Sequence, residues 1–259
     1  MMSVESKNYV ANQIVRFGEL LLYFGMNLAY RWDSPRKIFV STILGRNWNY
    51  QKFRNDFKLV NSSDICIVIV GAHFGETAEK YLGQISESQV IAYEPNLRSL
   101  QIAVEKLSIY GNRVNLIGKA VGSTSGTAKL NTYQDSGADS LKILLSEEKL
   151  DSMNCEVTTL DQELENVGKV DLLQIDCQGF EMEVILGMEK LIVEKRIDAI
   201  LIEGLLDNFY ENQSSFWELA AELSKSHRFC GFPSMKFGEG QKPNLLWVDA
   251  LFVRKELLS

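Results

Sequence analysis

Two acidic residues, Asp176 and Glu203, each close an apolar run of the sequence. The runs read LLQID (172–176) and AILIE (199–203), and both are typical of buried β-strands. Acids at the tips of neighbouring strands can line one pocket, where they exchange protons with a bound ligand. Either acid alone could instead cap a helix or pair with a lysine, so the two together are the stronger indication of a catalytic site.

A glycine turn follows another apolar run. ICIVIV (65–70) leads into GAHFG (71–75), and a helix-like stretch comes next. Gly71 permits a sharp turn after the strand, and Gly75 permits close approach at the start of the helix. The free N–H groups of such a helix favour a negatively charged ligand group, so the turn is a candidate ligand loop.

Glu94 lies 23 residues after Gly71, at the end of the next expected strand. A carboxylate there can accept hydrogen bonds from both hydroxyls of a ribose, and Pro95 then stops the strand. Together with the glycines, Glu94 predicts an adenosine-type ligand. Residues 72–74 fill the turn with AHF instead of completing GxGxxG, which disfavours a nicotinamide dinucleotide.

Short apolar runs alternate with helical stretches from residue 64 onward. The runs are apolar on both faces, as are the strands of a parallel sheet that is covered on both sides. This alternation predicts an α/β fold with a doubly wound, mostly parallel sheet, whose ligands bind over the carboxyl ends of the strands. The expected strands are 65–70, 90–93, 114–118, 172–176 and 199–203, and the expected helices are 76–84, 97–109, 180–194 and 213–225.

Some segments depart from simple alternation. GTAKLNTY (126–133) and CEVTTL (155–160) are expected to form two extra strands, with the turn-rich DSGADSLK (135–142) between them. The tail, residues 228–237 and 245–255, predicts a final antiparallel hairpin that closes the sheet.

The first 60 residues differ from the rest in charge. They carry nine Lys and Arg against four Asp and Glu, although the whole chain has a net charge of −7. We expect an N-terminal helical segment over 1–60 and the main domain over 61–259. A helix at 8–32 is apolar over most of its surface and must be covered. It is expected to pack on the main domain or in a homodimer; a membrane-surface helix is the alternative.

The acidic balance of the chain disfavours a nucleic-acid partner, because phosphate binding requires clustered Lys and Arg. The four cysteines form no CxxC pair, and only two histidines are present. This composition indicates a reduced, cytoplasmic protein without a metal site. The first residues do not have the order of a signal peptide, and no apolar run is long enough to be a transmembrane segment.

The motifs together resemble the FkbM-type S-adenosylmethionine-dependent methyltransferases. The resemblance covers about residues 64–204. It rests on the order and spacing of VIVGAHFGETA, AYEPN, GKAVGSTSG, VTTLD, LLQIDCQGFEMEVILG and AILIEG. It implies a class I methyltransferase fold, which is Rossmann-like, with S-adenosyl-L-methionine as cofactor. Members of the family typically methylate hydroxyls of sugars or natural products, and some methylate amides in peptides.

The resemblance also assigns expected roles to individual residues. Asp176 and Glu203 would face the methyl group and the acceptor, and Asp139 and Ser140 would line the acceptor side. His73 would serve as a base or only donate a hydrogen bond to the cofactor carboxylate. Asp161 is expected to cap a helix. The cofactor would be held by Gly71, Ala72, His73, Gly75, Glu94, Pro95, Lys119, Ala120 and Asp176.

Four positions depart from the family pattern. Ile69 replaces an acid and His73 an asparagine, while Gln174 and Gln178 replace a lysine and a glutamate of KIDVEG. These departures keep open a second hypothesis, that the chain is a non-catalytic binding or scaffold protein that has retained the fold. A dinucleotide oxidoreductase is a third and less favoured one.

Overall fold

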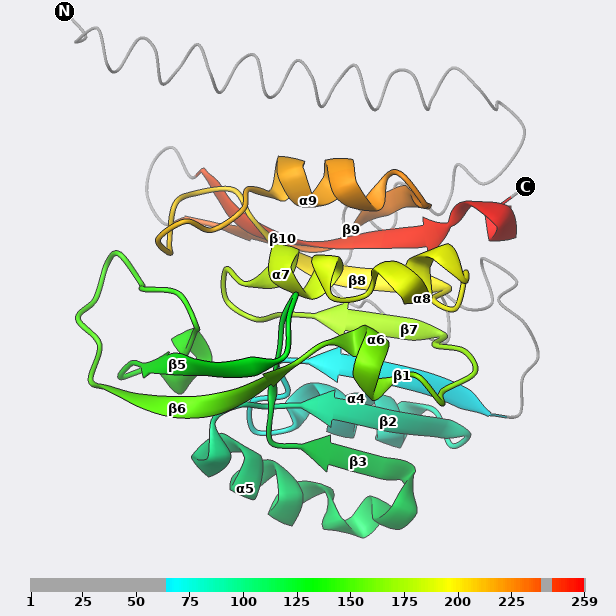
Figure 1. Cartoon of the computed structure of the whole chain (residues 1–259), viewed down its shortest axis with the longest axis horizontal. Helices are drawn as coiled ribbons and strands as arrows, with labels where there is room; N and C mark the ends of the chain where they lie inside the picture. Colours follow the sequence, from blue (N-terminus) through cyan, green and yellow to red (C-terminus); the bar gives the residue numbers. More distant parts are fainter. Residues whose placement is uncertain (1–63, 239–243, 259) are drawn as a thin grey trace, which may run out of the picture. The chain divides into compact units, whose positions relative to one another are not determined.

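The computed structural model describes residues 64–238 and 244–258 of the 259-residue chain. The expected helix at 8–32, the boundary near residue 61 and the homodimer through the N-terminal helices all lie outside the described residues. Everything below concerns the described part of the chain (Figure 1).

A mixed sheet forms the centre of the described structure, with seven strands in the order β3-β2-β1-β7-β8-β10-β9 (Figure 1). Neighbouring strands are parallel up to β8, and β10 is antiparallel to both β8 and β9. The predicted doubly wound sheet and the closing hairpin are therefore confirmed. The strands are β1 Ile65–Val70, β2 Ser88–Tyr93, β3 Val114–Ile117, β7 Leu172–Ile175, β8 Ala199–Leu205, β9 His227–Phe237 and β10 Leu245–Arg254.

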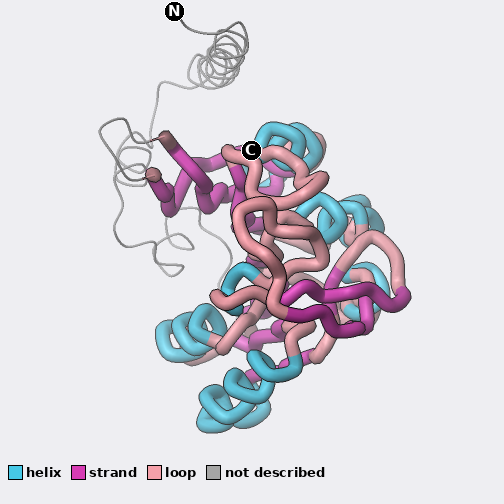
Figure 2. The backbone as a smooth tube through the Cα atoms, turned by 90° about the vertical axis from the view of Figure 1, so that its left-hand side faces the viewer, coloured by secondary structure: helices cyan, strands magenta, loops and turns pink. Residues whose placement is uncertain are grey.

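Helices cover both faces of this sheet, as Figure 2 shows. Along β1, Ile65, Ile67 and Ile69 pack with α4 and the end of α5, while Val68 and Val70 pack with α6 to α9. Strands buried on both faces explain the continuous apolar runs of the sequence. The helices are α4 Glu76–Gln84, α5 Leu97–Leu107, α6 Leu160–Glu163, α7 Glu181–Leu186, α8 Glu189–Val193 and α9 Phe216–Leu223, with short 3-10 turns at η1 Ser108–Arg113, η2 Ser136–Ala138 and η3 Lys255–Leu258.

The two extra strands that the sequence predicts are present, but they belong to a separate sheet. Its order is β4-β6-β5, with β4 Ala120–Val121, β5 Gly126–Thr132 and β6 Asp151–Thr158. The two-residue strand β4 is too short to leave a periodic signal in the sequence. This small sheet lies beside the carboxyl ends of the main strands, and the chain from β5 to β6 returns toward them (Figure 1).

The helix expected at 180–194 is instead two helices, α7 and α8, separated at Gly187. A Cβ on Gly187 would lie 2.0 Å from the carbonyl oxygen of Gly122, so the backbone approaches β4 too closely for any other residue. Asp161 lies within α6 and does not cap it, because Thr159 does so. The carboxylate of Asp161 instead accepts from the backbone N–H groups of Lys190 and Leu191, and so binds the start of α8.

Candidate functional site

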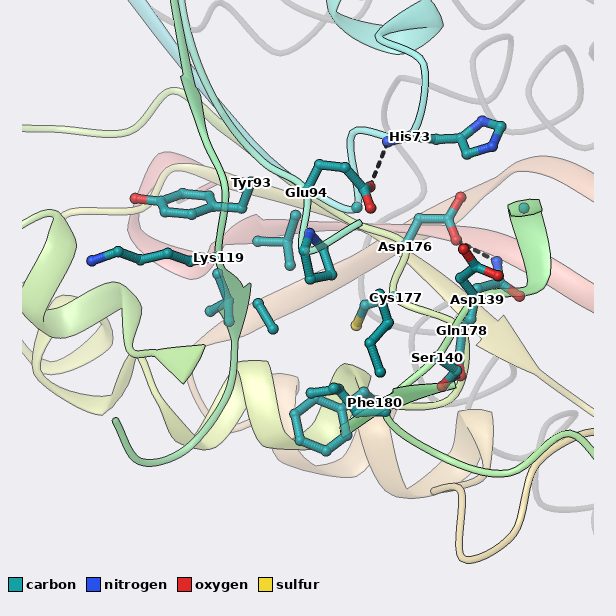
Figure 3. A pocket seen from close by; sticks show the side chains of 18 of the residues that line it. His73, Tyr93, Glu94, Lys119, Asp139, Ser140, Asp176, Cys177, Gln178 and Phe180 are labelled. Carbon is teal, nitrogen blue, oxygen red and sulfur yellow. Dashed lines mark hydrogen bonds between the residues drawn. The ribbon is translucent and has the colours of Figure 1, made fainter. Parts of the chain in front are cut away.

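A cavity of about 170 Å³ opens at the carboxyl ends of β1, β2 and β7 (Figure 3). A water molecule needs about 10–15 Å³ by the same measure, so the cavity has room for an organic ligand. The small sheet closes its other side. The lining residues are Val70, Gly71, His73, Tyr93, Glu94, Pro95, Lys119, Ala120, Val121, Leu130, Ser136, Gly137, Asp139, Ser140, Leu141, Asp176, Cys177, Gln178 and Phe180.

Two glycines shape the turn after β1. Gly71 has a φ of 87°, and a Cβ there would lie 1.8 Å from the carbonyl oxygen of Asp176. Gly75 caps α4 with a φ of 82°, and its Cβ would meet the side chain of Leu107. Only Gly71 and His73 of this turn line the cavity, because Ala72 is buried in the core and Gly75 packs against α5.

Glu94 lies at the tip of β2 with its carboxyl group buried. Oε2 accepts from the backbone N–H of His73 at 2.7 Å, and Oε1 accepts from the backbone N–H of Asn96 at 2.9 Å. Burial raises the pKa of Glu94 to about 7, although the two hydrogen bonds oppose that shift. Each oxygen keeps a second lone pair, so the group can accept further hydrogen bonds from a ligand in the cavity.

The cavity loop, which we define as residues 133–141 between β5 and β6, lies against the turn after β1. Nε2 of His73 is 2.9 Å from Oγ of Ser136. The side-chain amide of Asn96 donates to Oδ2 of Asp139 at 2.7 Å, and Oδ1 of Asp139 accepts from the backbone N–H of Tyr133. Asn96 also caps α5 through Oδ1. Both oxygens of Asp139 therefore hold the loop in place.

Ser140, the other residue expected on the acceptor side, also forms contacts within the loop and the adjacent turn. Its hydroxyl donates to the backbone carbonyl of Gln178 at 2.7 Å and accepts from the backbone N–H of Lys142 at 3.0 Å. Asp139 and Ser140 thus line the cavity, and the contacts of their polar atoms indicate that they shape its wall.

Asp176 follows β7, and Glu203 lies in β8. The side-chain amide of Gln178 donates to Oδ1 of Asp176 at 2.8 Å and lies 3.2 Å from Oε2 of Glu203. Burial raises the pKa of both carboxyl groups, and the charge of Asp176 raises that of Glu203 further, well above its usual value. The two carboxyl groups therefore titrate as a pair, in which a second negative charge is disfavoured. Of the two acids, Asp176 lines the cavity, and Glu203 lies behind Gln178.

Lys119 and Ala120 line the cavity from the start of the small sheet. The ammonium group of Lys119 lies 2.8 Å from Glu156 and 3.1 Å from Glu163, and in Figure 3 it points away from the other labelled side chains. Its charge is therefore neutralised outside the cavity, and its backbone is the part available to a ligand.

Several cavity residues were missed by the sequence interpretation. Gln178 had a signal, since it lies two residues after the strand-end acid Asp176 and departs from the family pattern. Tyr93, Cys177 and Phe180 had none, because an apolar or aromatic residue next to a strand end is common in any core. Phe180 packs on Gly122, where a Cβ would lie 3.0 Å from its ring.

A family model described as the methyltransferase FkbM domain matches residues 70–234, which is more than half of the chain. The chain belongs to the FkbM methyltransferase family. The matched range contains β2, β7 and β8 and every cavity residue described above. The class I methyltransferase fold expected from the sequence is thereby confirmed.

Three solved structures are similar to this chain at low sequence identity. An rRNA methylase from Streptococcus thermophilus is 11% identical, with a TM-score of 0.44 and coverage of 81% of this chain and 98% of that one. TehB from Haemophilus influenzae is 9% identical, with a TM-score of 0.46 and coverage of 82% of this chain and 64% of that one. TrmK from M. capricolum, in complex with S-adenosylhomocysteine, is 11% identical. Its TM-score is 0.40, and the match covers 78% of this chain and 67% of that one. No curated protein matches the sequence.

The departures from the FkbM pattern are accommodated by their surroundings. Ile69 is buried in the core beside α4, so an apolar side chain suits its position. Gln174 accepts a hydrogen bond from the hydroxyl of Tyr81 at 2.7 Å. Gln178 donates to the acid pair, where a glutamate would add a third carboxyl group. None of these residues obstructs the cavity.

Residues 64–238 and 244–258 contain neither a membrane-spanning helix nor a metal-binding cluster. No helix there is both long enough and apolar enough to cross a membrane. No group of three or more His, Cys, Asp or Glu side chains in those residues is arranged to hold a metal ion.

Proposed function

We propose that this FkbM-family protein transfers a methyl group from S-adenosyl-L-methionine to a hydroxyl of a small molecule or glycan. The observation that carries the proposal is the position of Glu94, whose buried carboxyl group lines the cavity directly beside the glycine turn. Its two backbone hydrogen bonds fix its direction and leave lone pairs for the ribose hydroxyls of the cofactor.

The remaining lining residues fit the same cofactor. The backbone of Lys119 and Ala120 is available to the adenine, and Gly71 and His73 lie where the methionine part would be held. S-adenosylmethionine supplies an electrophilic methyl group on a cationic sulfur. Asp176 provides a negative charge on the cavity wall that favours such a cation.

The acceptor side favours a hydroxyl that loses a proton during the reaction. Asp176 can accept that proton as a general base, because it lines the cavity and the amide of Gln178 donates to its carboxylate. The ammonium of Lys119, the one lysine among the described lining residues, is bound by two glutamates. A phosphate-rich acceptor is therefore disfavoured, and a neutral sugar or natural-product hydroxyl is preferred; an amide in a peptide is the alternative acceptor.

Calorimetric titration of the full chain with S-adenosylmethionine and with S-adenosylhomocysteine tests the cofactor. We expect saturable binding of one molecule per chain, and no binding of NADH. An absence of heat at millimolar cofactor would overturn the proposal and leave a scaffold function. Incubation with methyl-labelled cofactor and a small-molecule extract, followed by identification of the labelled product, then tests the acceptor class.

A further inference from the structure

A chain of hydrogen bonds runs from a buried tyrosine to the acid pair. The hydroxyl of Tyr210 donates to Oε1 of Gln178 at 2.8 Å, and Nε2 of Gln178 lies 2.8 Å from Asp176 and 3.2 Å from Glu203. We propose that Tyr210 and Gln178 are positioning residues, which hold the two carboxyl groups as a pair with a single shared proton. This inference rests on the proposed function and adds two residues to its machinery.

The chemistry of the groups fixes the direction of the chain. A carboxylate accepts hydrogen bonds, and an amide nitrogen only donates them. The amide of Gln178 must therefore turn its nitrogen toward the acids and its oxygen away from them. Tyr210 supplies the donor that this oxygen needs, so the phenol hydroxyl selects the productive orientation of the amide.

The backbone at Gln178 supports the same interpretation. Gln178 has a φ of 56°, and Gly179 has a φ of 91°. A non-glycine residue in this region is strained and is retained where neighbouring contacts enforce it. The hydroxyl of Ser140 bonds the carbonyl of Gln178, and the ring of Tyr210 lies against Gly179, where a Cβ would be 3.0 Å from it. These contacts direct the amide toward the pair.

Other titratable groups surround the pair on every side. Glu181 of α7 and Asp249 of β10 add negative charge, and burial raises their pKa to about 7 and about 6. His73 faces Asp176 from the turn after β1, and the hydroxyl of Tyr210 stays protonated because burial raises its pKa. These acidic neighbours oppose a second negative charge on the pair. The side-chain amide of Gln178 donates to the pair and so stabilises a single charge.

The proton balance of the reaction follows from this arrangement. The acceptor oxygen forms its bond to the methyl carbon, and the carbon–sulfur bond breaks with its electron pair left on sulfur. The hydroxyl proton passes to the carboxylate of Asp176. The pair then holds two protons and returns one to solvent before the next cycle. A pair that already held two protons could not take part.

Infrared titration of the full chain tests the inference without an acceptor. The carbonyl band of protonated carboxyl groups is recorded from pH 5 to 9, and the component absent from the Glu203→Gln variant is assigned to the pair. Tyr210→Phe removes the hydroxyl that donates to Gln178 and that also lies 3.3 Å from the carbonyl oxygen of Ala138. Gln178→Glu replaces the donating amide with a third acid. The doubly protonated pair loses one proton as the pH rises. In both variants we expect the midpoint of this step to rise by at least half a pH unit.

A matched control separates positioning from general stability. Tyr133→Phe also removes a buried tyrosine hydroxyl, one that accepts from the backbone N–H of Leu144 in the same apolar cluster as Tyr210. It should lower the Tm without moving the midpoint. Equal midpoints in the wild type, Tyr210→Phe and Gln178→Glu would overturn the inference. If Tyr210→Phe does not fold, the midpoint of Gln178→Glu alone tests it. Failure of the proposed function is distinct, since it appears as loss of cofactor binding in the wild type.

Discussion

The backbone N–H of His73 donates to Oε2 of Glu94 at 2.7 Å, so the turn after β1 and the tip of β2 share one buried carboxyl group. Glu94→Ala removes this acceptor and leaves buried donors unpaired, at a cost of about 1–3 kcal/mol. We expect S-adenosylmethionine to bind about 5- to 150-fold more weakly by calorimetry. Glu105→Ala, on the exposed side of α5, is the control. An unchanged dissociation constant would show that Glu94 does not contact the cofactor.

The affinity for the cofactor should also depend on pH through Glu94. Its pKa is raised to about 7 because the carboxyl group is buried, so the group is largely protonated in the free protein below that pH. Ribose hydroxyls bind best to the ionised form, and binding therefore strengthens as pH rises from about 6 to 8. Calorimetry across this range measures the effect, and Glu94→Gln should abolish it. An identical pH dependence in that variant would assign the effect to another group.

Glu181 should destabilise the fold at high pH. Its carboxyl group is buried and accepts from the N–H groups of Cys177 and Gly179, and burial raises its pKa to about 7 from 4.5. A raised pKa favours the protonated form in the folded state, so stability is full below about pH 4.5 and falls as pH rises to about 7.

Glu181→Gln keeps the accepting oxygen and removes this ionisation. We expect a higher Tm than that of the wild type at pH 8, by about 2–4 °C for each kcal/mol gained, and a similar Tm at pH 4.5. Glu189→Gln, at an exposed position, should behave like the wild type. Thermal unfolding followed by circular dichroism measures the Tm at the two pH values. An equal rise in Tm at both would show that the ionisation of Glu181 is not the cause.

Gly71→Ala should disrupt the junction between β1 and β7. The new Cβ would lie 1.8 Å from the carbonyl oxygen of Asp176, and the φ of 87° is strained for alanine. We expect a loss of more than about 3 kcal/mol, measured by urea unfolding. Gly168→Ala has no atom within 4 Å of its Cβ and should change stability little. Equal stability of the two variants would mean that the turn can move away from β7.

Asp176→Asn tests the proposed base. The substitution preserves size and removes the charge, so cofactor binding should persist while turnover falls by about 10²–10⁴-fold. Label transfer from the cofactor to the identified acceptor measures turnover, and calorimetry measures binding. Asp151→Asn, on an exposed residue of β6, is the control. Unaltered turnover in Asp176→Asn would remove this residue from the proton step.

The order of the central strands and helices could be predicted from the sequence because β1, β7 and β8 are buried on both faces and so form continuous apolar runs. β1, α4 and β7 follow their expected ranges almost residue by residue. The break between α7 and α8 could not be predicted, since it arises from contact between Gly187 and Gly122, which are 65 positions apart in the sequence.

The residues of the candidate site also divide into those that the sequence could predict and those that it could not. Gly71, Glu94 and Asp176 were found because strand tips are predictable and their residue types are unusual there. Tyr210 was not found, because it reaches Gln178 only after the chain has folded back across β8. Likewise, the ammonium of Lys119 turned out to bind Glu156 and Glu163, which no local pattern indicates.

Asn96 connects three parts of the molecule through one residue. Its Oδ1 caps α5, its Nδ2 holds Asp139 of the cavity loop, and its N–H holds Glu94. A substitution at this position therefore changes the side-chain contacts to α5 and Asp139 directly beside the backbone contact to Glu94. Anyone who redesigns the pocket for a new acceptor should therefore treat Asn96 as a fixed point, and direct diversity to Leu141 and Phe180, whose side chains serve fewer roles.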